Sequence, residues 1–275
     1  MATANFIPQI WSAALLHEFQ QAAVLAALTN RSYQGDAQVG NAVKITTAVP
    51  VEVKDYGTTR KTSPDAVTTT QVTLQINQER AFDIRIDDID RQQAAGSMGE
   101  FAFSGAQGLV SDADKWIAAQ LIAGAGSKKT GAVPDNGEAV WNIVRDLRTV
   151  LNKENVPASG QVLVVNPDFE ALLLGFNSKV TAVELAAETP NGMRDAYVGR
   201  ILGFDTYRTS HLPISNRPQA VAFHKSAYGF VNSITTVEAM RDADSFSDRL
   251  RGLNVYGGVA IRPSAIASFT ATTGG

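Results

Sequence analysis

Two long stretches of this chain alternate between apolar and polar side chains. In the first, residues 43–53, the odd positions are Val, Ile or Thr, whereas the even positions include Lys44 and Glu52. In the second, residues 68–86, most even positions carry Thr or an apolar residue such as Leu74. A period of two residues is typical of strands that bury one face. The two stretches therefore predict a β-hairpin, whose first strand would be roughly 36 Å long at about 3.3 Å per residue.

Between the two strands, residues 55–67 have the composition of an exposed turn. Gly57 and Pro64 favour turns, and charges of both signs surround them. An isolated two-stranded ribbon is marginally stable in water, so we expect the hairpin to lie on another surface. The charged residues either face solvent or meet opposite charges on a neighbouring subunit. In the second case the candidate contacts are Lys54, Asp55, Arg60, Lys61 and Asp65.

Apolar residues recur at helical spacings of three and four in three stretches, 10–28, 97–123 and 138–152. Polar residues interrupt the first stretch, which therefore predicts an amphipathic helix docked on its own chain or on a neighbour, and not a membrane span. Its apolar stripe includes Trp11 and Phe19, which are further candidate inter-subunit contacts. The second stretch predicts a helix of roughly 40 Å at 1.5 Å per residue.

The remainder of the chain alternates short elements with turns. Gly124, Gly126, Gly131 and Pro134 end the long helix and predict a loop. The elements expected after it, besides the helix at 138–152, are strands at 162–165, 200–207, 220–224, 228–231 and 255–261 and a short helix at 169–174. This mixture corresponds to the α+β fold class.

Composition narrows the function classes. The 275 residues are 44% hydrophobic and 19% charged, with a net charge of -3 and no cysteine. Ordinary soluble proteins have about 25% charged residues, so this chain is expected to hide surface in partners. The charge balance excludes a strongly basic nucleic-acid binder. The absence of cysteine excludes disulfides, thiolate catalysis and iron-sulfur clusters.

The segment 124–131 superficially resembles a phosphate-binding loop. That motif requires Gly-Lys-Ser/Thr between a strand and a helix, but here Ser127 separates Gly126 from Lys128, and the segment follows a helix. A nucleotide-binding enzyme that uses this loop, with Lys128 and Lys129 on the phosphates, stays as an alternative of another class.

Other candidate chemistry is sparse. The acidic residues Asp83, Asp87, Asp88 and Asp90 are interspersed with Arg80, Arg85 and Arg91, which favours ion pairs and helix capping over a metal site. His17, His211 and His224 lack metal-ligand spacing and are interpreted as packing or surface residues. We therefore expect no catalytic residue, no metal and no cofactor, and we do not expect an enzyme.

The order of the predicted elements resembles a known viral fold. The segments that carry the resemblance are 6–12 (Phe-Ile-Pro-Gln-Ile-Trp-Ser), 30–36 (Asn-Arg-Ser-Tyr-Gln-Gly-Asp), 82–90, 203–213, 246–253 and 256–263. Each is a packing or turn pattern, and the resemblance that they carry runs over nearly the whole chain, from residue 6 to residue 263. In order and spacing the chain resembles the major capsid proteins of tailed double-stranded-DNA phages, which share the Hong Kong phage type of capsid fold.

The resemblance implies a domain organisation. It assigns 1–40 to an N-terminal arm, 41–90 to an extended hairpin loop, 91–130 to a peripheral domain with a spine helix, 131–249 to an axial domain and 250–275 to the closing strand of the peripheral domain. The implied function is self-assembly into pentamers and hexamers of an icosahedral shell around double-stranded DNA. A bacterial encapsulin, a shell of the same fold around enzymes, is the alternative within this fold.

The resemblance also implies partners. We expect contacts with copies of the same chain, a separate scaffolding protein, a portal, a decoration protein and packaged DNA, and no membrane. Because the first forty residues offer Arg31 against Glu18 and Asp36, DNA is expected to be contacted non-specifically and without a basic arm. Some relatives crosslink a loop lysine, for which Lys54 and Lys61 are the candidates, but we expect noncovalent closure. The expected location is the virion capsid, assembled in the cytoplasm of the bacterial host.

Overall fold

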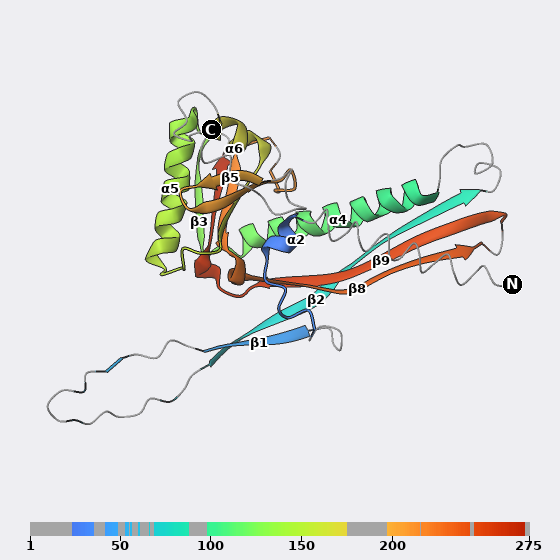
Figure 1. Ribbon diagram of the computed structural model, residues 1–275, viewed down its shortest axis with the longest axis horizontal. Coiled ribbons are helices and arrows are strands. Elements are labelled where there is room, and N and C mark those ends of the chain that lie inside the picture. The colour runs from blue at the N-terminus through green and yellow to red at the C-terminus, as the bar shows by residue number, and fades with distance from the viewer. Residues whose placement is uncertain are drawn as a thin grey trace.

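The protein consists of a layered body and a long sheet that extends beyond it (Figure 1). The structure is a computed structural model that describes residues 24–35, 42–48, 53–54, 56, 60, 66, 69–87, 98–174, 197–214, 216–242 and 245–272. Of the amphipathic helix expected at 10–28, the described part is α2 (Val24–Leu28). Trp11 and Phe19 lie outside the described residues.

The predicted hairpin is confirmed and belongs to a four-stranded antiparallel sheet. The strands lie in the order β1 (Ala42–Ala48), β2 (Thr69–Asp87), β9 (Ser247–Ala260) and β8 (Tyr228–Arg241). The described part of the first strand is shorter than expected, because β1 ends at Ala48, which pairs with Thr69, and Val53 is not in a strand.

The base of the hairpin packs on its own chain. Val43 and Ile45 of β1 and Leu74 of β2 are buried together with Val231 of β8, and Tyr33 packs against the same cluster. β2 also pairs with β9 from Ile76 to Asp87. The supporting surface expected for the hairpin is therefore supplied, for its base, by β8 and β9 of the same chain.

The predicted long helix is α4 (Met98–Ala123), which runs along one face of the long sheet (Figure 1). Phe82 of β2 fills the space between them: a Cβ atom added to Gly105 of α4 would lie 2.8 Å from the Phe82 ring. On the other side of the ring, a Cβ on Gly252 of β9 would also overlap it. Real Cβ atoms do not approach so closely. The two glycines therefore allow α4 and the long sheet to meet at Phe82, and this contact forms the seam between the helix and the sheet.

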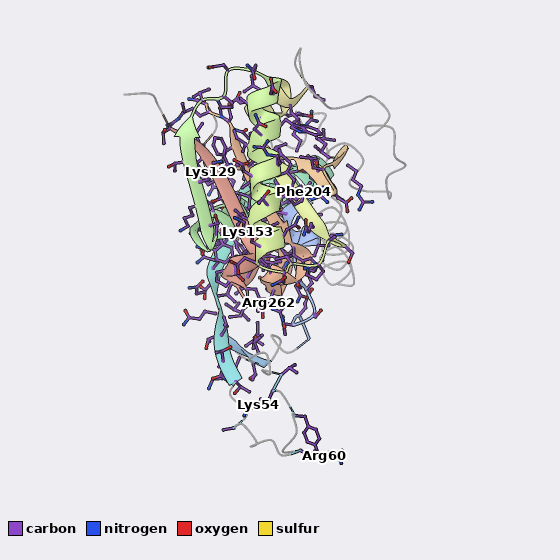
Figure 2. The ribbon with its side chains drawn as sticks, turned by 90° about the vertical axis from the view of Figure 1, so that its left-hand side faces the viewer. Lys54, Arg60, Lys129, Lys153, Phe204 and Arg262 are labelled. Atoms are coloured by element: carbon purple, nitrogen blue, oxygen red, sulfur yellow. The ribbon has the colours of Figure 1, made fainter. Side chains whose placement is uncertain are left out.

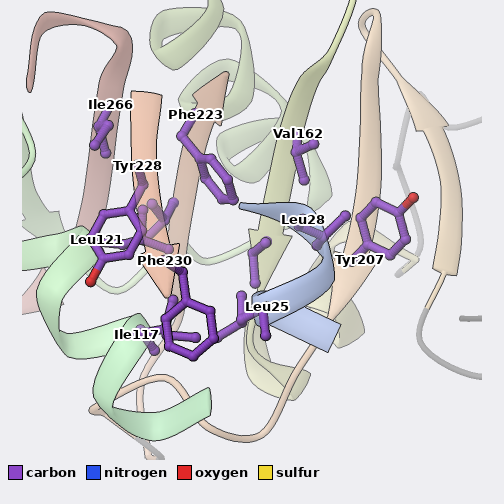
Figure 3. Packing of buried hydrophobic residues seen from close by; sticks show 14 of the residues in the cluster. Leu25, Leu28, Ile117, Leu121, Val162, Tyr207, Phe223, Tyr228, Phe230 and Ile266 are labelled. Carbon is purple, nitrogen blue, oxygen red and sulfur yellow. The ribbon is translucent and has the colours of Figure 1, made fainter. Parts of the chain in front are cut away.

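The body is built on a mixed six-stranded sheet. Its order is β3 (Ser127–Ala132), β10 (Ile266–Thr272), β7 (Gln219–His224), β4 (Gln161–Val165), β6 (Phe204–Arg208) and β5 (Tyr197–Ile201). One face is covered by α5 (Gly137–Lys153) and α6 (Pro167–Leu173), and their core includes Leu163. On the opposite face α2 and α4 pack against Val162 and Phe223 (Figure 3). Both faces are therefore apolar, which explains why β4 is a continuous run of buried residues.

Two direct strand-to-strand connections join the six-stranded sheet to the long sheet. β7 leads into β8 through a short 3₁₀ helix at Lys225–Ala227, and β9 leads into β10 through another at Pro263–Ala265. The amide groups of Ile261 and Arg262 both donate hydrogen bonds to the Ala227 carbonyl, at 2.8 and 3.1 Å. The two crossings are thus bonded to each other where they pass between the sheets.

The predictions for the second half are largely confirmed, with three corrections. The expected strand 200–207 is two antiparallel strands, because Leu202 and Gly203 both have positive φ and form a tight turn. The strand expected at 228–231 continues to Arg241 as β8. The segment 124–131, expected to be a loop, becomes strand β3 from Ser127 onward. β10 has no counterpart among the predicted elements.

The expected domain boundaries can be compared with strand pairing. The boundary at 130/131 falls within β3, which pairs with β10 in the sheet of the body. That sheet therefore includes strands from the 91–130 and 250–275 segments as well as from 131–249.

We predict that Gly105→Ala destabilises the protein by about 1–3 kcal/mol, the usual cost of overpacking, because its new methyl group would meet the Phe82 ring. Gly108, on the same helix, has nothing within 4 Å of an added Cβ, so Gly108→Ala is the matched control. It should stabilise by about 0.5–1 kcal/mol through helix propensity. Denaturant unfolding of the full chain measures both, and equal effects of the two substitutions would contradict this account of the seam.

Candidate assembly surface

The end of the β1–β2 hairpin carries exposed charged and apolar side chains. Lys54 and Arg60 lie there, far from the body and from Lys129 (Figure 2). Beside them Val53 is 96% exposed and Tyr56 57% exposed. Two large apolar side chains facing water at the end of an extension form a surface suited to a partner.

The sequence identified only part of this tip. Lys54 and Arg60 are exposed as expected, whereas Asp55, Lys61 and Asp65 lie outside the described residues. Val53 and Tyr56 were not among the candidates, since Val53 was assigned to the buried face of the strand. The signal that could have found them is their position beside turn-forming and charged residues, where burial against the own chain is hard to achieve.

The long sheet presents a charged face on the side opposite α4. Arg249 of β9 donates to Asp83 of β2, with 2.7 Å between Nε and Oδ1. On the same face Arg251 of β9 donates to Glu238 of β8 with 2.9 Å between Nε and Oε2. Asp83 therefore forms an ion pair as expected, but with an arginine of a distant strand and not with the interspersed Arg80 or Arg85. Asp88, Asp90 and Arg91 lie outside the described residues. The hydrogen bond from Arg249 lowers the pKa of the Asp83 carboxyl below its ordinary value.

A groove of about 410 Å³ lies on this charged face. Its apolar lining includes Ala81 and Leu253, and its polar lining includes Thr236, Glu238 and Arg251. Leu253 is exposed although it is flanked by ion-paired strands. The face thus offers a small apolar strip bordered by charges of both signs.

The opposite side of the sheet is fixed to α4 by a polar contact as well as by Phe82. Asp112 of α4 accepts a hydrogen bond from the Tyr256 hydroxyl at 2.8 Å and lies 3.0 Å from Nε of Arg80. Trp116 packs edge-on against the Tyr256 ring, with 5.4 Å between centroids. Burial, followed by the bond to Asp112, raises the pKa of Tyr256, which therefore stays a neutral donor. Residues of β2, β9 and α4 are joined at one point, and this makes the sheet a firm support for the hairpin.

The turn between β8 and β9 exposes a second aromatic residue. Phe246 is 82% exposed, and Met240 nearby in β8 is exposed as well. The turn is held by a bond from Ser245 to Asp242 at 2.9 Å and by an Arg241–Asp248 pair at 3.0 Å. In Figure 1 this turn and the β1–β2 hairpin lie at opposite ends of the molecule, so each end of the long sheet presents an aromatic side chain.

The chemistry considered for 124–131 is not supported. Lys128 Nζ donates to the Ala123 carbonyl at 2.6 Å, and Lys129 forms an ion pair with Asp146. The strand β3 pairs with β10 and does not curl into a phosphate cradle. Among the residues that the structure describes, no three acidic or histidine side chains are grouped to hold a metal ion. None of the described helices is long and apolar enough to cross a membrane.

The long sheet is braced by α4 and carries exposed aromatic side chains at both ends, which suits a structural subunit more than an enzyme. The family described as phage capsid protein matches residues 67–268. The chain belongs to this family of phage capsid proteins. A comparison with curated protein sequences found no match.

Solved structures agree with the family match. A chain of Mycobacterium phage Che8 is 40% identical, with a TM-score of 0.78 over 90% of this chain and 91% of that one. The mature capsid of bacteriophage PhiM1 is 17% identical, with a TM-score of 0.67 over 90% of this chain and 88% of that one. The virus-like particle from Pyrococcus furiosus shares the fold at 15% identity, with a TM-score of 0.64 over 96% of this chain and 100% of that one.

These findings establish the protein class. The chain is a major capsid protein with the fold of the Hong Kong phage type, as its sequence indicated, and its location is the capsid of the virion. The encapsulin alternative has less support, because the family match and the 40% identical chain both come from phages.

We predict that the Asp83–Arg249 pair stabilises the sheet at neutral pH and stops doing so in acid. Because the pKa of Asp83 is lowered in the folded protein, its contribution is present above the ordinary carboxyl pKa and is lost as pH falls through the folded value. Asp83→Asn should therefore lower the unfolding midpoint at pH 7, and its effect should shrink progressively as pH falls below the ordinary carboxyl pKa.

The control for this prediction is Glu79→Gln, on the same face of β2, because Glu79 forms no ion pair within the described residues. A difference between Asp83→Asn and the wild type that is independent of pH would contradict the assignment.

Proposed function

We propose that this capsid protein assembles into hexamers and pentamers of an icosahedral shell that encloses double-stranded DNA. The observation that carries the proposal is the hairpin whose base is anchored in its own chain while its tip exposes Val53 and Tyr56. Such a tip gains free energy by burial, at about 25 cal/mol per Å² of apolar surface, only if another molecule covers it. A second copy of the chain is the partner that a shell supplies at every position.

The mechanism is the addition of many weak contacts. Each subunit in a closed symmetric shell repeats the same few interfaces, so modest contacts at each become a stable assembly. The expected division into arm 1–40, loop 41–90, peripheral segments 91–130 and 250–275, and axial segment 131–249 gives each part a set of neighbours. In this proposal the axial segment surrounds the five-fold and six-fold axes, and the peripheral segments meet at the three-fold and two-fold positions.

The tip of one copy would occupy the groove on the charged face of the next. Its apolar side chains match the strip formed by Ala81 and Leu253, and its Lys54 and Arg60 match the carboxylates that border that strip. Asp55, Lys61, Asp65, Trp11 and Phe19 are proposed as further inter-subunit contacts on the pattern of their sequence alone.

The remaining partners follow from the same proposal. A separate scaffolding protein, a portal and a decoration protein would complete the particle, which would be assembled in the cytoplasm of the bacterial host. The net charge of -3 is compatible with DNA that is packed against the wall without specific attraction. In this proposal the protein has no catalytic step and no cofactor.

We predict that Val53→Ser combined with Tyr56→Ser prevents shell formation without unfolding the subunit. Both side chains are exposed, so the substitution should change the unfolding free energy by less than about 0.5 kcal/mol. Electron microscopy and sedimentation of the expressed full chain should show closed shells for the wild type and small oligomers for the variant.

The matched control is Val133→Ser, which removes exposed apolar surface from the body instead of the tip and should leave shells intact. Leu253→Ser tests the groove and should behave like the tip variant. A stable monomer of wild-type protein at high concentration would overturn the proposed function, and normal shells from the tip variant would overturn the role of the tip.

A further inference from the structure

Three side chains from distant parts of the sequence meet where α2, α4 and the connection between β6 and β7 come together. His211, in that connection, lies with its Nε2 atom 3.0 Å from the hydroxyl of Ser111 on α4. Its other ring nitrogen, Nδ1, lies 3.7 Å from Oδ2 of Asp114, one turn further along the same helix. Neither the seam between helix and sheet nor the assembly surface uses this cluster.

Asp114 is buried and only partly hydrogen-bonded. The residue is 1% exposed, and its Oδ2 atom accepts a bond from the Val24 amide at 3.3 Å. Val24 is the first described residue of α2, so this bond ties α2 to α4 through a backbone amide. The second oxygen, Oδ1, and the facing Nδ1 of His211 are both buried and have no hydrogen-bond partner in the described part of the chain.

The unsatisfied Nδ1 of His211 lies 3.7 Å from Oδ2 of Asp114, the oxygen that already accepts from Val24, so this contact is not closed. A separation of 3.7 Å is too long for a hydrogen bond. A buried carboxylate without its full set of partners costs free energy, and a cation beside it relieves that cost. A proton on the imidazole would supply the cation, since both ring nitrogens of a protonated histidine are donors.

Ser111 keeps the ring in place in either state. A hydroxyl group can donate to a neutral Nε2 or accept from a protonated one, so the bond at 3.0 Å survives the change of charge. The ring therefore does not need to turn over when it gains a proton at Nδ1, and only the distance to Asp114 has to shorten.

Other charged groups on the surrounding elements are engaged elsewhere or face solvent. On α4, Asp112 is bonded to Tyr256 and Arg80, and Lys115 is exposed. α2 has no titratable side chain. At the end of β6, Arg208 pairs with Glu170. Asp114 is therefore the acidic group placed to respond to the charge of His211.

We propose that Asp114 and His211 form a proton-operated latch between the base of the N-terminal arm, α4 and the body. When the imidazole is protonated, its charged N–H closes on Asp114 and fixes the β6–β7 connection to α4. When it is neutral, the two buried atoms lose this contact and the junction opens more often. This inference concerns the subunit itself and does not depend on the proposed shell.

The direction with pH follows from the partner. Because the protonated histidine gains a carboxylate in the closed form, the stabilisation is present in mild acid and is lost as pH rises.

Hydrogen exchange of the full-length protein tests this latch. After correction for intrinsic exchange, peptides that cover 24–30 and 207–214 should open roughly tenfold less often at pH 5.5 than at pH 8, the effect expected of one charge-assisted hydrogen bond. Asp114→Asn keeps an acceptor for Val24 but removes the charge, and His211→Gln removes the titrating ring. Both should abolish the difference between the two pH values.

The matched control is His224→Gln. The His224 ring also bonds a serine hydroxyl, that of Ser226 at 2.8 Å, and the Ser159 carbonyl at 2.9 Å, but no carboxylate among the described residues pairs with it. This variant should retain the full pH effect. Equal protection at both pH values in the wild type, or a pH effect that persists in His211→Gln, would overturn the proposal, and His211→Gln decides the question if Asp114→Asn does not fold.

Discussion

The arrangement of this subunit depends on how closely α4 can approach the long sheet. Phe82 occupies the space between Gly105 of the helix and Gly252 of the neighbouring strand, and a side chain at either glycine would overlap the ring. The bonds of Asp112 to Tyr256 and Arg80 require the same close approach. Because β2 belongs both to this seam and to the hairpin, the seam also fixes where the hairpin leaves the body. Exposure of the tip is thus a consequence of packing some distance away from it.

Local periodicity was sufficient for the elements whose neighbours impose a regular pattern. α4, α5 and β2 each have one face on a core, and their spacing was visible in the sequence. β10 was missed because its Ile-Ala-Ser-Phe-Thr-Ala-Thr run mixes small and polar residues, and four of its first five positions are buried by the two-sided cover of the sheet. The end of β1 was misplaced because the sequence alternates as far as Val53, whereas the described pairing with β2 ends at Ala48.

The functional surface was harder to predict than the fold. Charge alone indicated Lys54 and Arg60, but the exposure of Val53 and Tyr56 depends on where the pairing of the hairpin stops. The ion pairs of Asp83 were expected, whereas its partner is 166 residues away in the chain. His211 was interpreted as a packing or surface residue, and its proximity to Asp114 follows only from the meeting of α4 with the β6–β7 connection. Long-range proximity of this kind leaves no trace in the spacing of a single sequence.

The paired crossings between the two sheets have a mechanical consequence. Force applied at the end of the long sheet reaches the six-stranded sheet directly through two strand connections side by side, which are bonded to each other at the Ala227 carbonyl. Two adjacent segments share tension, and they resist twisting more than a single linker would. Because α4 also holds the long sheet at Phe82 and Asp112, separating the two sheets would require breaking that contact as well as these crossings. A subunit in a wall under internal pressure would transmit load through its backbone and not through side-chain contacts alone.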